Sequence, residues 1–183
     1  MPTATNVTAA KPAVSGAVWH AATGSTLPTD ASTSLDAAFT SAGYLSEDGL
    51  TNANSIESEE IKAWGGDVVY NLQTGKSDHF TFTLIEELNS EVMKIVHGSS
   101  NVSGALATGI TINANGKQLD AESWVFEMVL RGGVLKRIVV PYASVIETGE
   151  VQYIDNGVVS YQVTISATPD SSGNTHYEYI KSA

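Results

Sequence analysis

The sequence predicts a mainly β domain that carries one α-helix, and three observations support this fold class. Ser and Thr together supply 38 residues and Gly another 16, a composition typical of strands joined by turns. Several segments alternate between apolar and polar residues, which is the period of a half-buried strand. One segment instead repeats its apolar residues at helical spacing.

The clearest predicted strand covers residues 78–86, where Phe80, Phe82 and Leu84 point to one face. Residues 67–73 alternate in the same way. Because one face of such a strand is apolar, we expect the three apolar side chains of 78–86 to lie in a core. Weaker strands are predicted at residues 14–20, 56–64, 109–114 and 176–181.

Two β-hairpins are predicted in the second half of the chain. The first spans residues 124–142 and turns at Gly132-Gly133. The second spans residues 151–167 and turns at Asp155-Asn156-Gly157. An Asn-Gly pair between apolar runs favours a type I′ turn, because both central residues of that turn need positive φ.

The predicted helix follows the strand at 78–86. Four apolar residues share one of its faces: Leu88, Val92, Ile95 and Val96. Asn89 is the predicted N-cap, and Leu88 and Met93 are expected to pack across it. Gly98 is expected to end the helix in the left-handed region. A further short helical turn is predicted from Leu35 to Phe39.

Three stretches show no clear periodicity. Residues 1–13 are predicted to form an N-terminal arm, and residues 23–34 an exposed connection. Residues 46–66 are predicted to form a long loop that leads into a strand. We expect its polar part, 46–58, to become ordered only on assembly, because it cannot bury enough apolar surface to offset its chain entropy. The whole chain, 1–183, is expected to form one domain.

Composition and charge exclude several classes of function. Nine Lys and Arg against 20 Asp and Glu give a formal net charge of −11, which disfavours ordinary binding to nucleic acids or anionic lipids. The chain has no Cys, which excludes thiolate nucleophiles and Cys-based zinc sites. No apolar run approaches the roughly 18 residues of a membrane span, and the N-terminus lacks the basic start of a secretory signal. We therefore expect a soluble protein that is made inside a cell.

No arrangement of residues predicts catalysis, so we expect no enzyme activity, no cofactor and no metal site. Asp78-His79 resembles part of a catalytic triad, but adjacent strand residues face opposite ways. Glu86-Glu87 is more typical of solvated carboxylates than of an acid/base pair. Residues 170–178 carry oxygen-bearing side chains without the spacing of a calcium loop, which favours a simple turn. The four scattered His residues lack metal-ligand spacing: His20, His79, His97 and His176.

The three tryptophans leave two interpretations open. Trp19, Trp64 and Trp124 would form a sugar-stacking platform if they shared one exposed face. Tryptophans of a β domain more often belong to its core, and we favour that interpretation.

Seven short segments follow one another across residues 14–100: GAVW (16–19), GSTLPTD (24–30), LDAAF (35–39), GYLSEDGLTNANS (43–55), EEIKAWGGD (59–67), FTFTLIE (80–86) and EVMKIVHG (91–98). Their order resembles the major tail proteins of long-tailed bacteriophages. These proteins are the tail-tube subunits of siphophages, and the resemblance is strongest to those of phages that infect actinobacteria. Residues 101–183 agree with this family in hairpin content more than in motif.

The resemblance implies a fold of two β-sheets packed as a sandwich or partial barrel, flanked by one helix. It also implies hexameric rings that stack into a hollow tube, with a long loop that bridges rings and an N-terminal arm that reaches a neighbour. DNA would pass through the lumen without specific binding. The implied location is the virion tail, after synthesis in the bacterial host cytoplasm. The implied partners are further copies of the chain and the tail terminator, tape measure and distal tail proteins.

Under this interpretation the polar loop and its flank contain the contacts between subunits or rings. Two rival interpretations remain open: a β-sandwich binding module, either carbohydrate-binding or a virion decoration protein, and the tube protein of a contractile tail or secretion system. The candidate contact residues are Ser46, Glu47, Asp48, Leu50, Asn52, Asn54, Ile56, Glu57, Glu59 and Trp64.

Overall fold

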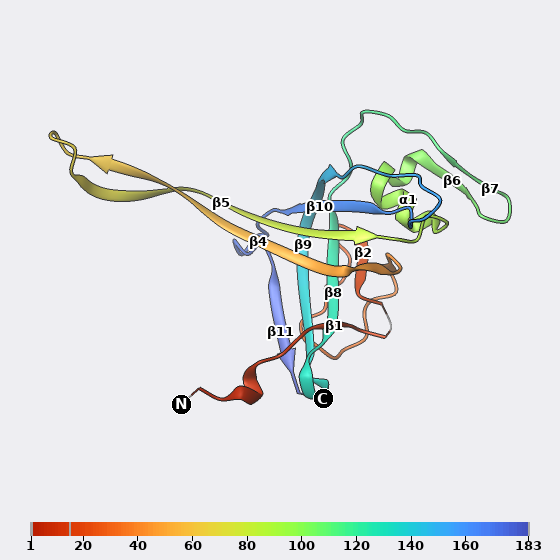
Figure 1. The fold of residues 1–183 in the computed structure, drawn as a ribbon, viewed down its shortest axis with the longest axis horizontal. Helices are drawn as coiled ribbons and strands as arrows, with labels where there is room; N and C mark the ends of the chain where they lie inside the picture. The colour runs from red at the N-terminus through yellow and green to blue at the C-terminus, as the bar shows by residue number, and fades with distance from the viewer. Residues whose placement is uncertain (1, 15, 183) are drawn as a thin grey trace.

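One antiparallel sheet of nine strands forms most of the molecule, and a separate two-stranded sheet and one helix lie beside it (Figure 1). The computed structural model of the chain describes residues 2–14 and 16–182. In the large sheet the strand order is β3-β2-β8-β9-β10-β5-β4, with β1 paired to β8 and β11 paired to β9. The small sheet pairs β6 with β7. The strands are β1 (Lys11–Pro12), β2 (Val18–Ala22), β3 (Thr40–Ser41), β4 (Leu45–Lys62), β5 (Val68–Leu84), β6 (Val102–Ala105), β7 (Gly109–Ile112), β8 (Glu122–Val129), β9 (Leu135–Thr148), β10 (Tyr161–Ala167) and β11 (Tyr177–Lys181).

The core forms where the large sheet folds back on itself, so that β5 faces β8. The ring of Phe80 stacks on Phe126 with centroids 5.3 Å apart, and Phe82 contacts both Phe126 and Trp124. Phe80, Phe82 and Leu84 are all buried, which confirms the predicted parity of this strand. The mainly β fold class with one flanking helix is therefore confirmed, and the sheet does not close into a barrel.

The prediction of a loop at residues 46–66 is wrong for most of its length, because β4 continues to Lys62 and only the last residues form a turn. Residues 46–58 lie within β4, which pairs with β5 from Leu45↔Leu84 to Lys62↔Val68. The outer part of this ladder buries neither of its faces, so it shows no apolar alternation. Its order comes from backbone hydrogen bonds, which any residue type except Pro can make. The weak strand predicted at 56–64 and the strand predicted at 67–73 are the two strands of the outer part of this ladder and pair with each other.

The first predicted hairpin is confirmed, and the second is confirmed only in its returning strand. β8 and β9 pair around Gly132 and Gly133, whose φ values are 77° and 83°. Residues 151–160 form no strand, and β10 pairs with β9 and β5 instead. The predicted type I′ turn is wrong, since positive φ among the described residues occurs only at certain glycines, and Gly157 is not one of them.

The predicted helix is confirmed as α1 (Ser90–His97). The Asn89 side chain accepts a hydrogen bond of 3.0 Å from the Glu91 N–H, so Asn89 is the N-cap. Gly98 ends the helix with φ 93° and ψ 138°, which is a positive φ outside the left-handed helical region. Leu88 is 66% exposed, so the contact predicted between Leu88 and Met93 does not anchor this end. The residues that α1 buries are Val92, Met93, Ile95 and Val96.

The remaining predicted segments agree with the structure only in part. Residues 35–39 form a turn, closed by the Phe39 N–H on the Asp36 carbonyl at 3.0 Å, and not a helix. The connection at 23–34 is exposed only in part, because Pro28 and Ala31 are buried. The strands predicted at 109–114 and 176–181 correspond to β7 and β11, and the one predicted at 14–20 begins only at Val18, with residue 15 outside the described residues.

The N-terminal arm lies along the body and then extends away from it (Figure 1). It contains a short 3-10 helix, Ala4–Asn6, and joins the large sheet where Lys11 pairs with Val129 and Pro12 with Met128. Met1 lies outside the described residues. Within the part of the chain that the structure describes, no helix is long and apolar enough to cross a membrane.

Candidate functional site: the projecting hairpin

The distal parts of β4 and β5 extend far beyond the body as a two-stranded ribbon (Figure 1). Pairing between β5 and β10 stops at His79↔Ser166, whereas pairing between β4 and β5 continues to Lys62↔Val68. We call residues 53–77 the projecting hairpin. At about 3.3 Å per residue, its strands reach roughly 30 Å from the last β10 pairing. Within the described residues, no third strand covers either of its edges.

A tight turn at residues 63–67 closes the projecting hairpin. The Ala63 N–H donates to the Asp67 carbonyl at 2.8 Å, and the Gly66 N–H donates to the Ala63 carbonyl at 3.0 Å. Gly65 and Gly66 have φ values of 119° and 100°, which L side chains rarely adopt, so the turn requires glycine at these positions. The turn leaves Trp64 fully exposed at the outermost end.

The projecting hairpin exposes an unusual number of large apolar side chains. On a monomer of this size such a concentration marks an interaction surface. Ile61 and Tyr70 are cross-strand partners, and Glu59 pairs with Leu72. The exposed apolar residues are Ile56, Ile61, Trp64, Val68, Val69, Tyr70 and Leu72.

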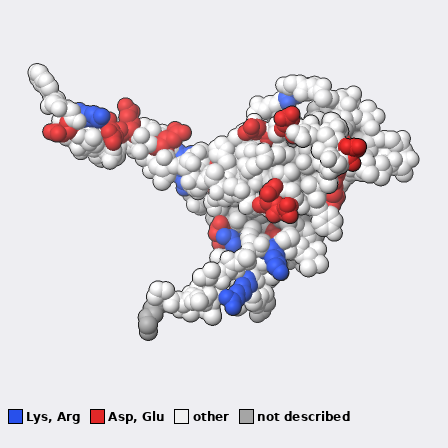
Figure 2. Space-filling view, viewed as in Figure 1, with Lys and Arg blue, Asp and Glu red and all other residues white. Residues whose placement is uncertain are grey.

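Acidic side chains lie in separate patches along the projecting hairpin, with lysine between them (Figure 2). The acidic residues are Glu57, Glu59, Glu60 and Asp67, and the basic ones are Lys62 and Lys76. Lys62 lies 3.6 Å from Glu60, but both side chains are more than half exposed, so this pair contributes little stability. Charged side chains on an open strand edge disfavour aggregation through strand pairing with unrelated chains. They favour a partner surface of complementary charge.

The body end of the hairpin is held by a buried carboxylate. The side chain of Asp78 is fully buried and accepts hydrogen bonds from Asn52, Thr175 and His176. Burial by itself would raise the pKa of the Asp78 carboxyl, but these hydrogen bonds and the charge of His176 hold it below its usual value. Asp78 therefore stays ionised at neutral pH.

The structure divides the predicted contact residues into three groups, one of which comprises Ser46, Glu47 and Asp48 at the start of β4. Leu50 pairs with Phe82 and packs against the core, and Asn52 donates to Asp78, so these two serve the body. Ser46 donates to Asp48 in the irregular first part of β4. The remaining predicted residues that project from the body are Asn54, Ile56, Glu57, Glu59 and Trp64.

Sequence reasoning missed the β5 side of the projecting hairpin. Alternation at 67–73 predicted that one face would be buried, but Val68, Tyr70 and Leu72 are all exposed. The apolar Val69 between Val68 and Tyr70 breaks the alternation and was the available signal that both faces carry apolar residues here.

The other candidate sites have structural roles. Asp78 and His79 do not form a triad, because His79 lies on the opposite face of β5. Glu86 accepts from the Tyr44 N–H at 2.9 Å and from the Asn89 side chain at 2.8 Å. Asp170 accepts from the N–H groups of Ser172 and Asn174 and from the Tyr177 hydroxyl, which closes the turn predicted at 170–178. Among the described residues, no group of three His, Cys, Asp or Glu side chains could hold a metal ion.

The tryptophans do not form one platform. Trp124 is buried in the core, Trp19 is half-buried on β2, and Trp64 lies at the hairpin tip. The core interpretation is therefore right for Trp124 and wrong for Trp64.

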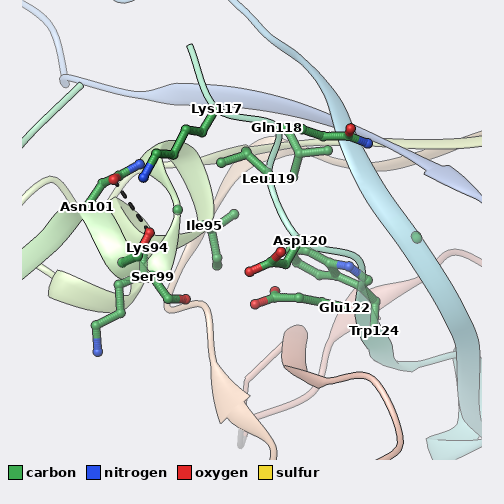
Figure 3. Close-up of a pocket in the computed structure, with 14 residues that line it drawn as sticks. Lys94, Ile95, Ser99, Asn101, Lys117, Gln118, Leu119, Asp120, Glu122 and Trp124 are labelled. Carbon is green, nitrogen blue, oxygen red and sulfur yellow. Dashed lines mark hydrogen bonds between the residues drawn. The ribbon is translucent and has the colours of Figure 1, made fainter. Parts of the chain in front are cut away.

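A small cavity of about 150 Å³ lies between the C-terminal end of α1 and the segment that leads into β8 (Figure 3). Its charged lining residues are Lys94, Lys117, Asp120 and Glu122, and the Lys94 amine donates to Glu91 outside the lining. Glu122 is already held by the His20 Nδ1 at 2.8 Å. The serines of the lining are Ser99 and Ser100, and neither hydroxyl is hydrogen-bonded to a general base among the described residues, so the cavity does not provide an activated nucleophile.

The chain as a whole matches a protein family. The family model described as phage tail tube protein matches residues 3–183. The chain belongs to the phage tail tube protein family. This tail tube protein is therefore a structural component of a phage tail and not an enzyme. Among solved structures, it is similar to the anti-feeding prophage cap, described as a tube terminating cap, at 11% identity with a TM-score of 0.46 over 94% of this chain and 93% of that one. No curated protein sequence matches it.

Proposed function

We propose that copies of this tail tube protein assemble into hexameric rings, that the rings stack into a hollow tube, and that phage DNA passes through this tube into the host cell. Each copy acts as one domain over residues 1–183, is made in the bacterial host cytoplasm and becomes part of the virion. The tail terminator, tape measure and distal tail proteins are its further partners. The single observation that carries the proposal is the projecting hairpin in a chain of this family.

The projecting hairpin has the properties of a subunit contact. Its open edges offer backbone donors and acceptors to which another chain can add a strand. The contact is expected to be heterologous, because the hairpin and whatever receives it are different surfaces of the same chain. Heterologous contacts build rings where the rotation closes and continuous stacks where it does not, as a tube requires.

Trp64 is the strongest anchor that the projecting hairpin offers. It is fully exposed in the single chain, and tryptophan is enriched among the residues that dominate binding energy when they enter a pocket of the partner. The exposed apolar residues that flank it would become buried together with it. Assembly would then remove the largest exposed apolar patch of the projecting hairpin from water.

The charge of the chain favours passage of DNA over retention. Six copies at −11 each would place −66 formal charges on a ring. Phosphate contacts with Lys and Arg dominate DNA affinity, so an acidic wall repels the strand and leaves it mobile.

Electron microscopy of the concentrated purified protein and of the source virion tests the proposal. We expect rings with six subunits and tubes of uniform diameter, and a tail built of this chain. A protein that stays monomeric and is absent from virions would contradict it. A sheath around the tube would identify a contractile tail instead, and a monomer whose tryptophan fluorescence responds to glycans would identify a binding module.

Substitution at the hairpin tip separates assembly from folding. Trp64→Ala is expected to leave the melting temperature unchanged, because the side chain contacts solvent, and to reduce tube yield strongly. Val158→Ala, another exposed apolar residue but outside the projecting hairpin, is the matched control and is expected to assemble normally. Normal tubes from Trp64→Ala would remove the anchor role of the tip.

A further inference from the structure

The direction of the projecting hairpin depends on how its base is held. An isolated two-stranded ribbon is only marginally stable in water, and no third strand among the described residues pairs with this one from Asp78 outward. At this point the structure buries a carboxylate completely, since the side chain of Asp78 is 0% exposed. A buried charge costs free energy unless hydrogen bonds compensate for it, and this one lies beside His79, where the pairing of β5 with β10 ends.

Three residues compensate the charge of Asp78, namely Asn52, Thr175 and His176, and we call these three and Asp78 the root cluster. The Asn52 Nδ2 donates to Asp78 Oδ1 at 2.7 Å and to the His79 carbonyl at 3.1 Å. The Thr175 hydroxyl donates to Asp78 Oδ2 at 2.6 Å, and the His176 Nδ1–H donates to the same oxygen at 2.5 Å. Both carboxylate oxygens are therefore engaged, each by a different part of the chain.

The root cluster joins both hairpin strands to a distant segment. Asn52 belongs to β4 and Asp78 to β5, whereas Thr175 and His176 precede β11. That distant segment is itself held firmly, because the His176 ring packs edge-on against Phe80 with centroids 5.4 Å apart. The other charged groups near His176 are Glu178, whose carboxylate lies 4.0 Å from Nε2, and Lys136, which pairs with Glu178 at 2.9 Å.

We propose that Asp78 is a positioning residue, and that the root cluster sets the direction of the projecting hairpin in the free subunit. The hairpin is then presented to the next copy in its binding orientation instead of being ordered on contact. Preorganisation of this kind lowers the entropic cost of association. The consequence for tube assembly rests on the proposed function, whereas the fixed direction does not.

The absence of Cys from the chain allows a direct measurement of this direction. Spin labels would be placed at Glu60→Cys, which is exposed near the tip, and at Ile146→Cys, which is exposed on β9 in the body. Pulsed electron paramagnetic resonance on the monomer then gives the distance distribution between the two labels. For the otherwise unaltered chain we expect one narrow distribution.

Asp78→Ala removes all three hydrogen bonds of the carboxylate and is expected to broaden the distribution and shift its mean. Asp155→Asn is the matched control, because it removes one negative charge from an exposed carboxylate outside the projecting hairpin. A third variant, Thr175→Val with His176→Phe, leaves the hairpin sequence intact and removes the two donors of the distant segment. It is expected to shift the distribution as Asp78→Ala does, and it decides the question if Asp78→Ala does not fold.

A folded Asp78→Ala or Thr175→Val/His176→Phe variant with an unchanged distribution would overturn the proposal. Tube yield measured on the same variants tests the consequence for assembly, and we expect it to be lost in both and kept in Asp155→Asn. Normal tubes from a variant with a displaced hairpin would overturn the role in assembly. If the unaltered chain forms no tubes, the proposed function fails, and the distance distributions still decide whether the root cluster sets the direction.

Discussion

Phe82 shows how a single residue holds the two faces of the folded sheet together. Its ring is buried, and the ring centroid lies 5.6 Å from that of Trp124 and 5.7 Å from that of Phe126. Phe82→Ala is expected to lower the free energy of unfolding by about 3–5 kcal/mol, because it removes apolar contacts and leaves a cavity. Chemical denaturation measures this, with Thr83→Ala on the opposite face as the control. A loss under about 1 kcal/mol would contradict the role of Phe82 in the core.

Asp78 predicts a dependence of stability on pH. Its pKa is lowered in the folded state, so its contribution to stability is present above the pKa of the unfolded chain and is lost as pH falls through the lower folded value. The melting temperature of the unaltered chain should therefore exceed that of Asp78→Ala at neutral pH, and the difference should shrink below about pH 4. A difference that stays constant down to pH 2 would show that the carboxylate charge contributes nothing.

At the scale of elements, the projecting hairpin is distinct from the body in the kind of force that orders it. The strands of the body are held by a buried apolar face, whereas the hairpin is held by a two-stranded ladder and by its root cluster. Bulges at Glu57/Ser58 and Ile61/Lys62 increase the local twist of this ribbon and make its edges less regular. A hairpin of this kind can be shortened without disturbing the core.

Replacement of residues 56–76 by Asn-Gly tests this independence. The new turn would join Ser55 to its cross-strand partner Ser77, which is the geometry of a two-residue hairpin loop, and would leave Asp78 in place. We expect a folded monomer with a melting temperature close to that of the full chain and no tubes. Circular dichroism and electron microscopy give the two readouts. Tubes of normal diameter from this variant would show that the hairpin takes no part in assembly.

At the scale of the whole molecule, the formal net charge is −11, and part of the positive charge is already paired with carboxylates. Several of the nine Lys and Arg are engaged by carboxylates, as in Lys94–Glu91, Lys136–Glu178 and Arg137–Glu127. The remaining acidic surplus disfavours binding of DNA, whose affinity for proteins comes mainly from Lys and Arg contacts to phosphate.

The assembled protein is therefore expected not to bind double-stranded DNA even at low salt, where electrostatic attraction is strongest. Electrophoretic mobility shift at about 10 mM and about 150 mM salt measures this. A basic DNA-binding protein is the positive control. Retardation of DNA that disappears at the higher salt would contradict a repelling wall.

The sequence by itself determined the parts of this protein whose order comes from local apolar pattern. Alternation predicted the buried face of Phe80, Phe82 and Leu84, and capping chemistry predicted the helix that begins after Asn89. Only the tertiary structure decided that residues 46–58 form a strand, because a ribbon outside the core buries no face and leaves no period in the sequence. It also decided that His176 donates to Asp78. The two residues are 98 positions apart, and no local sequence pattern connects residues that meet only when the sheet folds back.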